Sequence, residues 1–245
     1  MLRDLYDGCM DTIIDSCLSG IMGEIITDER LQSAVAVLGD FCFPAGEPNA
    51  ELLREASRKH GPGEMIIAAR DVAWQQLIEN SFAGHFEKET RYAISRDDYY
   101  FDREKLTLAA ASLPEGYMIQ YIDEELYNSC LQADWCRDFV SQYKDWSMFE
   151  RLGLGVVALY KGEIVAGASS YSTWSRGIEI EVDTREDHRR KGLAYACSAA
   201  LILACLERNW FPSWDAANMI SVALAEKLGY KRADEYPIWI MYIRN

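Results

Sequence analysis

The sequence predicts an α/β fold, in which a mixed, twisted sheet with flanking helices follows a smaller α/β domain. Residues 178–184 alternate between apolar and polar side chains, which is typical of a strand. The apolar, Ala-rich run at 193–206 is too long for a strand and indicates a helix. Helix breakers at 113–116 interrupt the chain, and a new series of elements begins after them. We therefore expect an N-terminal domain at 1–112 and a C-terminal domain at 113–245.

The composition is that of a folded, acidic, globular protein. The 245 residues are 49% hydrophobic and 12% aromatic, which is enough for a substantial core. Lys and Arg number 25 against 39 Asp and Glu, so the formal net charge is −14. This charge opposes general binding to nucleic acid or to an anionic membrane. In addition, no apolar run approaches membrane-spanning length. We therefore expect neither a nucleic acid nor a membrane as partner.

The seven cysteines include no C-x-x-C pair, and most fall where an apolar segment needs a small hydrophobic residue. Reduced thiols in the core of a cytoplasmic protein are the simplest interpretation. The three histidines, His60, His85 and His188, are isolated from one another and from any cysteine pair. No metal site is therefore expected.

The first twenty residues predict a surface helix and not a targeting signal. An acidic stripe, which includes Asp4 and Asp11, lies opposite an apolar stripe that includes Leu5 and Ile13. This pattern is typical of a helix at the surface of a folded domain.

The rest of the N-terminal domain is expected to contain both strands and helices. The expected strands are 23–27, 33–43, 65–69 and 91–95, and the expected helices are 50–60 and 72–80. Pro44, Gly46 and Pro48 should end the second strand, and Asn49 should cap the helix that follows it. The polar and aromatic run at 97–105 predicts a short helix and a solvated loop, and no catalytic pattern emerges in this half.

In the C-terminal domain, a strand is followed by helices, three strands, a helix, a strand, a helix and final strands. The expected strands are 117–122, 153–160, 163–172, 178–184, 210–214, 230–233 and 238–243. The expected helices are 124–131, 134–142, 193–209 and 218–228.

One stretch, GIEIEVDTREDHRRKGLAYACS at 177–198, combines a strand, a basic turn and the start of a helix. Such a junction gathers unpaired backbone N–H groups where an anion can bind. Gly192 permits close backbone approach, and Arg189, Arg190 and Lys191 offer positive charge. We interpret the turn as a pyrophosphate site, and the alternative is a basic turn that is merely solvated.

Two motifs carry a resemblance to a known family. The spacing Arg189-x-x-Gly192-x-Ala194 resembles the acyl-CoA signature of the GNAT superfamily of N-acetyltransferases. Asn218-x-x-Ser221, followed by Lys227-Leu228-Gly229-Tyr230, resembles its other signature. The resemblance covers about residues 113–245, and the whole chain resembles the smaller family that includes zwittermicin A resistance acetyltransferases.

The resemblance implies the GNAT fold, with acetyl-CoA as co-substrate in a V-shaped opening between the fourth and fifth strands of the domain. It implies that the backbone of the central strand pairs with the pantetheine arm and that Asn218 hydrogen-bonds near the thioester, with Ser221 in the same motif. The pantetheine contacts would come from Val182, Asp183 and Thr184. The pyrophosphate would be held by the N–H groups of Arg190, Lys191, Gly192, Leu193, Ala194 and Tyr195.

Direct attack on a thioester needs an amine that has lost a proton, and a carboxylate can accept that proton. Glu179 and Glu181 are the candidate bases, since alternation places both on one face of the strand. Alternatively they are solvated or paired with Arg176 or Arg185. A backbone N–H of the central strand can stabilise the developing oxyanion.

The general acid is where this chain departs from the family. The Tyr that often follows the motif Asn by seven residues is replaced by Ala225. The hydroxyls of Ser221, Tyr195 and Tyr230 lie near in sequence, and solvent protonation of the thiolate would also suffice.

Acidity and the carboxylate face favour a small cationic amine as acceptor. The N-terminal half is expected to contribute to the acceptor pocket or to homodimer contacts. A different class remains open, namely a CoA-binding sensor or interaction protein without turnover. A nucleic-acid binder conflicts with the net charge.

Overall fold

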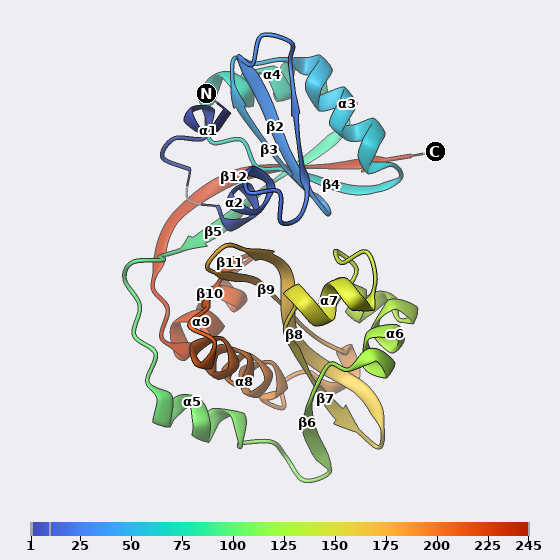
Figure 1. Cartoon of the computed structure of the whole chain (residues 1–245), viewed down its shortest axis with the longest axis vertical. Helices are drawn as coiled ribbons and strands as arrows, with labels where there is room; N and C mark the ends of the chain where they lie inside the picture. The colour runs from blue at the N-terminus through green and yellow to red at the C-terminus, as the bar shows by residue number, and fades with distance from the viewer. Residues whose placement is uncertain (1, 10, 245) are drawn as a thin grey trace. The chain divides into compact units, whose positions relative to one another are not determined.

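The computed structural model describes residues 2–9 and 11–244, which form two compact units. The first unit holds Met1–Ala93 and Asp234–Asn245, and the second holds Ile94–Ala233 (Figure 1). The boundary that we expected after residue 112 lies inside the second unit. The physical reason is that the helix at 103–110 packs on the helix at 193–207, and the N–H of Tyr100 donates to the carbonyl oxygen of Gly229. Residues 234–245 join the first unit because the last strand pairs antiparallel with one of its strands.

The first unit has nearly all the elements that the sequence predicts, with different bounds at its start. Its helices are α1 (Leu2–Leu5), α2 (Thr12–Leu18), α3 (Ala50–His60) and α4 (Val72–Ser81). Its strands are β1 (Glu24–Thr27), β2 (Ser33–Leu38), β3 (Phe41–Gly46), β4 (Gly63–Ile67), β5 (Phe86–Ile94) and β12 (Arg232–Ile243), the last two each reaching one or two residues into the second unit.

Two N-terminal expectations are wrong in detail. The single opening helix is two helices, because Gly8 between them has φ of 80°, which a right-handed helix cannot continue through. Met1 and Met10, which that expectation included, lie outside the described residues. The strand expected at 33–43 is two strands, β2 and β3, joined by a turn at Gly39.

Pro44 lies inside β3, although we expected it to end the strand. The pairing of β3 with β4 covers only Phe41 and Cys42, so from residue 43 onward that edge of β3 is unpaired. Pro is tolerated where its missing N–H is not needed by a neighbouring strand. The end of β3 and the residues that follow β4 form part of the wall of a cavity.

The first unit buries an apolar core on its sheet, in which the strands of this unit follow one another in the order β1-β2-β3-β4-β12-β5. Trp74 of α4, Leu53 of α3 and Trp239 of β12 are fully buried and belong to one cluster. Asn49 caps α3, since its side chain accepts a hydrogen bond from the N–H of Glu51.

From residue 117 onward, the second unit has the order of helices and strands that the sequence predicts, with two additions, a helix at 146–152 and a strand at 215–216. Its strands are β6 (Tyr117–Tyr121), β7 (Gly155–Tyr160), β8 (Glu163–Trp174), β9 (Gly177–Thr184), β10 (Phe211–Ser213) and β11 (Asp215–Ala216). Its helices are α5 (Arg103–Ala110), α6 (Glu124–Gln132), α7 (Trp146–Leu152), α8 (Leu193–Glu207) and α9 (Met219–Leu228), with 3-10 turns η1 (Asp134–Phe139) and η2 (Glu186–His188). We expected an α-helix at 134–142 and no helix at α7, while the two final strands are one, β12.

The sheet of the second unit has the order β10-β9-β8-β7-β6, with a single parallel pair at β10 and β9. Helix α8 packs on β7, β8 and β9, and η1 also packs on β8 and β9. Figure 1 shows α8 on one side of this sheet and α6 and α7 on the other. The core of the unit therefore fixes β9 and α8 against each other, and the segment that joins them is the candidate site.

Candidate functional site

An opening lies between β9 and β10, because these parallel strands pair over only three residues. Gly177 to Glu179 pair with Phe211 to Ser213, and the register ends there. On its other edge, β9 continues to pair with β8 as far as Thr184. Within the described chain, the β10-side edge of 180–184 has no strand partner, so its backbone can bind an extended ligand.

The turn between β9 and α8 contains two left-handed residues. Arg190 has φ of 62° and Gly192 has φ of 80°, whereas Arg189 is extended, and a turn in which the sign of φ alternates can form a nest of N–H groups that binds an anion. Among residues 2–9 and 11–244, no protein group accepts a hydrogen bond from the N–H groups of 190–195. A Cβ added at Gly192 would meet no atom within 4 Å, which leaves room for a ligand to reach these amides.

Helix α8 adds the positive end of its dipole to the same point. It is 15 residues long, and it begins directly after Gly192, its N-cap residue. The first N–H groups of a helix have no partner within it, and aligned peptide dipoles give its N-terminus a partial positive charge. The residues proposed for pyrophosphate binding, from Arg190 to Tyr195, therefore present one converging set of donors.

Two of the basic side chains hold the turn in place. Nε of Arg189 donates to the carbonyl oxygen of Thr184 at 3.0 Å, and its guanidinium lies 3.7 Å from Asp183. Nζ of Lys191 donates to the carbonyl oxygen of Asp187 at 3.0 Å. The backbone amides, more than these side-chain cations, are thus placed to bind a phosphate.

His188 anchors the turn through its buried ring, a role that the sequence did not predict. Its ring is buried, with 6% exposed, and Nδ1 lies 2.8 Å from the hydroxyl of Tyr117. Nη2 of Arg185 lies 3.0 Å from Nε2. Oδ2 of Asp187 also lies 3.5 Å from Nε2, so both ring nitrogens of His188 have polar partners.

Arg185 is itself held by two carboxylates. It contacts Asp187 at 2.8 Å and Glu163 at 3.0 Å, and the hydrogen bond from Arg185 lowers the pKa of Asp187. The spacing of Arg185 and His188, three residues apart in a polar turn, was the signal in the sequence. Only the fold shows that Tyr117, on β6, completes the contact.

The candidate bases lie where β9 leaves β10. Glu179 is at the last paired position, and Glu181 is two residues further, on the same face of the strand. Glu179 is only 9% exposed, so the alternative of a fully solvated side chain is wrong for it. Its carboxylate is near enough to Tyr230 to raise the pKa of that phenol, although burial is the larger cause.

The motif residues Asn218 and Ser221 are engaged in the local structure of α9. Oδ1 of Asn218 accepts hydrogen bonds from the N–H groups of Ile220 and Ser221, both at 3.0 Å. Nε1 of Trp214 donates to the Ser221 hydroxyl at 3.0 Å. Asn218 therefore caps the helix with its oxygen, and its amide nitrogen is the part that can donate to a ligand.

No hydroxyl replaces the Tyr that the family often has after this Asn. Ala225 is fully buried inside the unit. The hydroxyl of Tyr230 donates to the carbonyl oxygen of Pro212 at 2.6 Å, and burial raises its pKa well above the usual value. The ring of Tyr195 lies under Lys227, whose Nζ is 3.6 Å from the ring centroid. The proton donor for the leaving group thus stays unassigned.

A parted pair of parallel strands beside the N-terminus of a helix is a place where α/β proteins bind anionic ligands. The chain belongs to the GNAT acetyltransferase family, whose model matches residues 3–239.

Relatives of known structure or sequence agree with this assignment. A GCN5-related N-acetyltransferase-like protein from Streptococcus suis is 44% identical, covers 98% of both chains and superposes with a TM-score of 0.92. The N-acetyltransferase YdfB of Bacillus subtilis is 30% identical over 68% of this chain, and the match spans 62% of its own length. A GCN5-related N-acetyltransferase from Kribbella flavida, 14% identical over 96% of both chains, shares the fold at a TM-score of 0.59.

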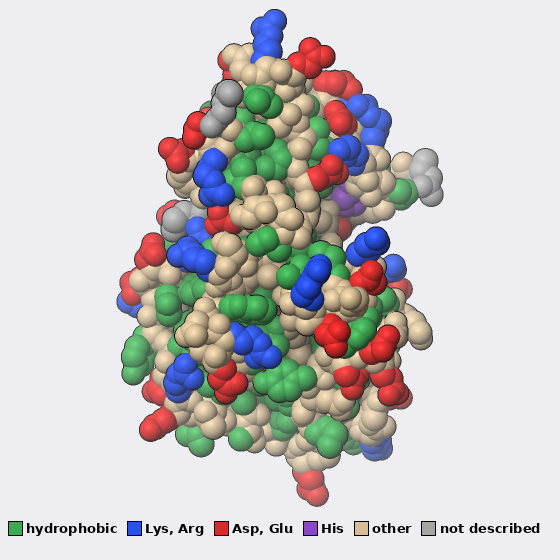
Figure 2. All heavy atoms as spheres, viewed as in Figure 1, with side chains coloured by type: hydrophobic (Ala, Val, Ile, Leu, Met, Phe, Trp, Pro, Cys, Tyr) green, Lys and Arg blue, Asp and Glu red, His purple; other side chains and the backbone are tan. Residues whose placement is uncertain are grey.

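The described surface carries mixed charge. On the face drawn in Figure 2, Lys and Arg side chains are interspersed with Asp and Glu side chains. No helix in the described part of the chain is long and apolar enough to cross a membrane. Residues 2–9 and 11–244 contain no group of three His, Cys, Asp or Glu side chains that could hold a metal ion.

Proposed function

We propose that this protein transfers the acetyl group of acetyl-CoA to the primary amine of a small, cationic acceptor by direct attack. The observation that carries the proposal is the nest at Arg190 and Gly192, next to the unpaired edge of β9. Acetyl-CoA supplies a thioester that is activated toward amines. A diphosphate fits the nest because the amides there have no protein acceptor in the described chain and Gly192 leaves the space open.

The chain's own residues then have three tasks. The N–H groups of 190–195 hold the diphosphate, and the backbone of Val182, Asp183 and Thr184 orients the extended arm along the opening. The carboxylate of Glu179 or Glu181 accepts the proton that the acceptor's ammonium must lose before it attacks. A backbone N–H of β9 stabilises the oxyanion that develops.

The acceptor's positive charge is proposed from electrostatics. The chain carries a net charge of −14, and the carboxylates of β9 stand at the opening. A field of one sign raises the local concentration of an oppositely charged substrate and weakens with salt. The free cysteines fit a cytoplasmic location, which we also propose.

The test is release of free CoA thiol across a library of amines, with neutral and anionic analogues for comparison. Glu179→Gln and Glu181→Gln are measured separately, and we expect the base to lose about 100-fold in kcat. Equal rates for cationic and neutral acceptors at low salt would contradict the charge argument. Full activity in both variants would remove the carboxylates from the mechanism.

A second function, CoA binding without turnover, is favoured by one observation. Ala225 stands where the family often has a tyrosine, and the hydroxyl of Tyr230 already donates to Pro212, so neither position offers a ready proton donor for a leaving thiolate. Both functions predict that acetyl-CoA raises the melting temperature. Only the enzyme releases thiol when amine is added, so absence of thiol despite a stabilising shift would favour the sensor.

A further inference from the structure

The first unit repeats the order of elements of the second. Three antiparallel strands (β1, β2, β3), helix α3, strand β4 parallel to β3, and helix α4 follow one another. In the second unit, β7, β8, β9, α8, β10 and α9 do the same.

The last helices of both series also begin alike. Oδ1 of Asp71 accepts from the N–H groups of Ala73 and Trp74, at 2.8 and 3.3 Å, as the side-chain oxygen of Asn218 does in α9. The junction of β3 and β4 therefore corresponds to the junction of β9 and β10.

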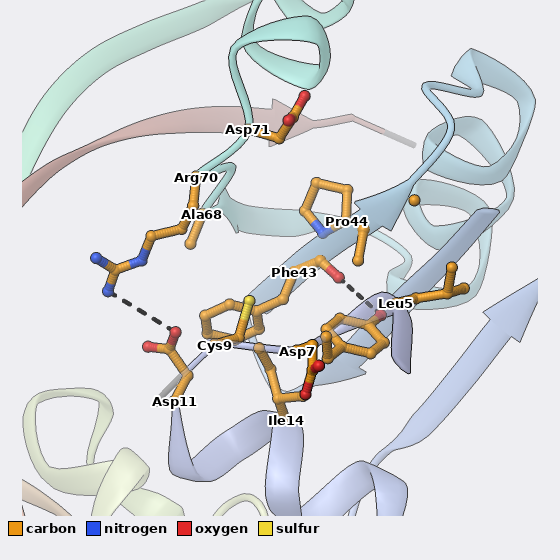
Figure 3. A pocket seen from close by; sticks show the side chains of 13 residues that line it. Leu5, Asp7, Cys9, Asp11, Ile14, Phe43, Pro44, Ala68, Arg70 and Asp71 are labelled. Atoms are coloured by element: carbon orange, nitrogen blue, oxygen red, sulfur yellow. Dashed lines mark hydrogen bonds and ion pairs between the residues drawn. The ribbon is translucent and has the colours of Figure 1, made fainter. Parts of the chain in front are cut away.

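A cavity opens where β3 and β4 part. The strands pair at Phe41 with Ile66 and at Cys42 with Ile67, and the cavity begins at the next residue, Phe43. Its volume is about 290 Å³, and its walls come from the end of β3, the turn after β4 and the α1–α2 segment (Figure 3). Ligands of α/β sheets bind outside the carboxyl ends of strands at such a parting, and this volume suits a small molecule.

Within the described chain, the turn before α3 differs from the turn before α8. The N–H of Glu47 donates to the carbonyl oxygen of Gln32 at 2.8 Å, and Pro48 has no N–H. The N–H of Glu51, in the first turn of α3, donates to Asn49 at 3.0 Å. These donors are engaged, and the same segment carries the carboxylates of Glu47 and Glu51. The turn before α3 therefore disfavours a phosphate, whereas the turn before α8 favours one.

The cavity has an apolar floor, and its charged lining residues have a net negative charge. Tyr6, Ile14 and Phe43 are each less than 5% exposed, and the hydroxyl of Tyr6 donates to the carbonyl oxygen of Phe43 at 3.1 Å. Their buried, satisfied side chains give the cavity a preformed apolar surface.

Three carboxylates and one guanidinium line the same cavity, those of Asp7, Asp11, Asp71 and Arg70. Arg70 is engaged by Asp11 at 3.8 Å and by the ring of Tyr236, whose centroid is 3.8 Å from the guanidinium carbon. Figure 3 shows Arg70 turned toward Asp11. Of the other two carboxylates, Asp71 caps α4 through Oδ1, which leaves Asp7 as the main source of negative charge in the lining.

We propose that this cavity is a second ligand site, which binds a small primary ammonium compound with a short apolar body. The apolar body lies on Phe43 and Ile14, and the ammonium faces the exposed carboxylate of Asp7. The site lies within the first unit and uses no residue of the acetyl-transfer site. It therefore stands whether or not the proposed transfer reaction does.

The experiment is calorimetric titration of the full chain, at low salt, with benzylammonium, benzyl alcohol and benzoate as matched probes. We expect benzylammonium to bind at least about tenfold more tightly than the alcohol, because it adds the charge interaction. Asp7→Asn should weaken its binding about fivefold. Glu29→Gln makes the same charge change at an exposed position that does not line the cavity, and it should leave the affinity unchanged.

Two further variants locate the probe. Ala68→Leu adds bulk to the cavity wall and should abolish binding while the thermal unfolding transition is retained. Gly192→Asp, which alters the proposed diphosphate site, should leave benzylammonium binding unchanged, and so should Glu181→Gln, which alters the proposed acceptor site of the second unit.

Four results would overturn the proposal. The first is equal affinity for the alcohol and the ammonium, and the second is no binding up to about 10 mM, which is weaker than any specific site of this kind. The third is unchanged binding in Asp7→Asn, and the fourth is loss of binding in Gly192→Asp or in Glu181→Gln. If Ala68→Leu does not fold, the comparison of Asp7→Asn with Glu29→Gln decides.

Discussion

Replacing Gly192 by Asp puts a carboxylate at the point where the nest and the N-terminus of α8 are proposed to hold a diphosphate. Gly192 has φ of 80°, and the space beside it is open, so the side chain fits sterically but lies in the path of the ligand. The left-handed conformation costs a residue with a Cβ about 1–2 kcal/mol of stability. The larger effect is on binding.

The magnitude follows from Coulomb's law. Two like charges about 4 Å apart repel by about 1 kcal/mol in water and about 4 kcal/mol at the effective dielectric of a protein surface. A middle value of about 2.7 kcal/mol corresponds to a loss of about 100-fold in affinity. We therefore expect the KM for acetyl-CoA to rise about 100-fold in Gly192→Asp.

The assay is thiol release at varied acetyl-CoA, with calorimetric binding of CoA as a second readout. Gly192→Asn has nearly the same shape as Gly192→Asp but no charge. The smaller rise in KM that we expect for it measures the effect of backbone strain and bulk without charge repulsion. Gly84→Asp is a matched control, because Gly84 has φ of 78° and open space beside it in the first unit. Wild-type KM in Gly192→Asp, or an equal loss in Gly84→Asp, would refute the placement of the diphosphate.

Three other predictions concern the second unit. His188→Ala should raise the KM for acetyl-CoA about tenfold with little change in kcat, because the turn loses a buried anchor; unchanged steady-state kinetics would show that the anchor is dispensable. Tyr230→Phe should lower the free energy of unfolding by about 1 kcal/mol, since only the bond to Pro212 is lost, and a 100-fold fall in kcat would instead make Tyr230 the proton donor. Burial raises the pKa of the Cys197 and Cys205 thiols to about 12, so iodoacetamide should not label them in the native protein at pH 8, as read by mass spectrometry. Because their pKa is higher in the folded than in the unfolded state, the free energy of unfolding should decrease as the pH rises from 9 toward 12, and a flat profile there would contradict the burial argument.

Local sequence signals placed most elements of the second unit to within a few residues. Alternation located β9, and the length of the Ala-rich run distinguished α8 from a strand. The same signals failed where the pattern was interrupted. The left-handed turns at Gly8 and Gly39 split one expected helix and one expected strand, since apolar periodicity continues across a turn that changes direction.

The sequence by itself determined the two motifs, the basic turn and the family to which they point, because these depend on residues close together in the chain. Only the tertiary structure decided how β12 joins the first unit, that Tyr117 meets His188, and that β3 parts from β4 as β9 parts from β10. Each of these depends on pairing between segments far apart in sequence. A residue pattern specifies the face of a strand, whereas the packing of the whole unit selects its neighbour and the residue at which the pairing ends.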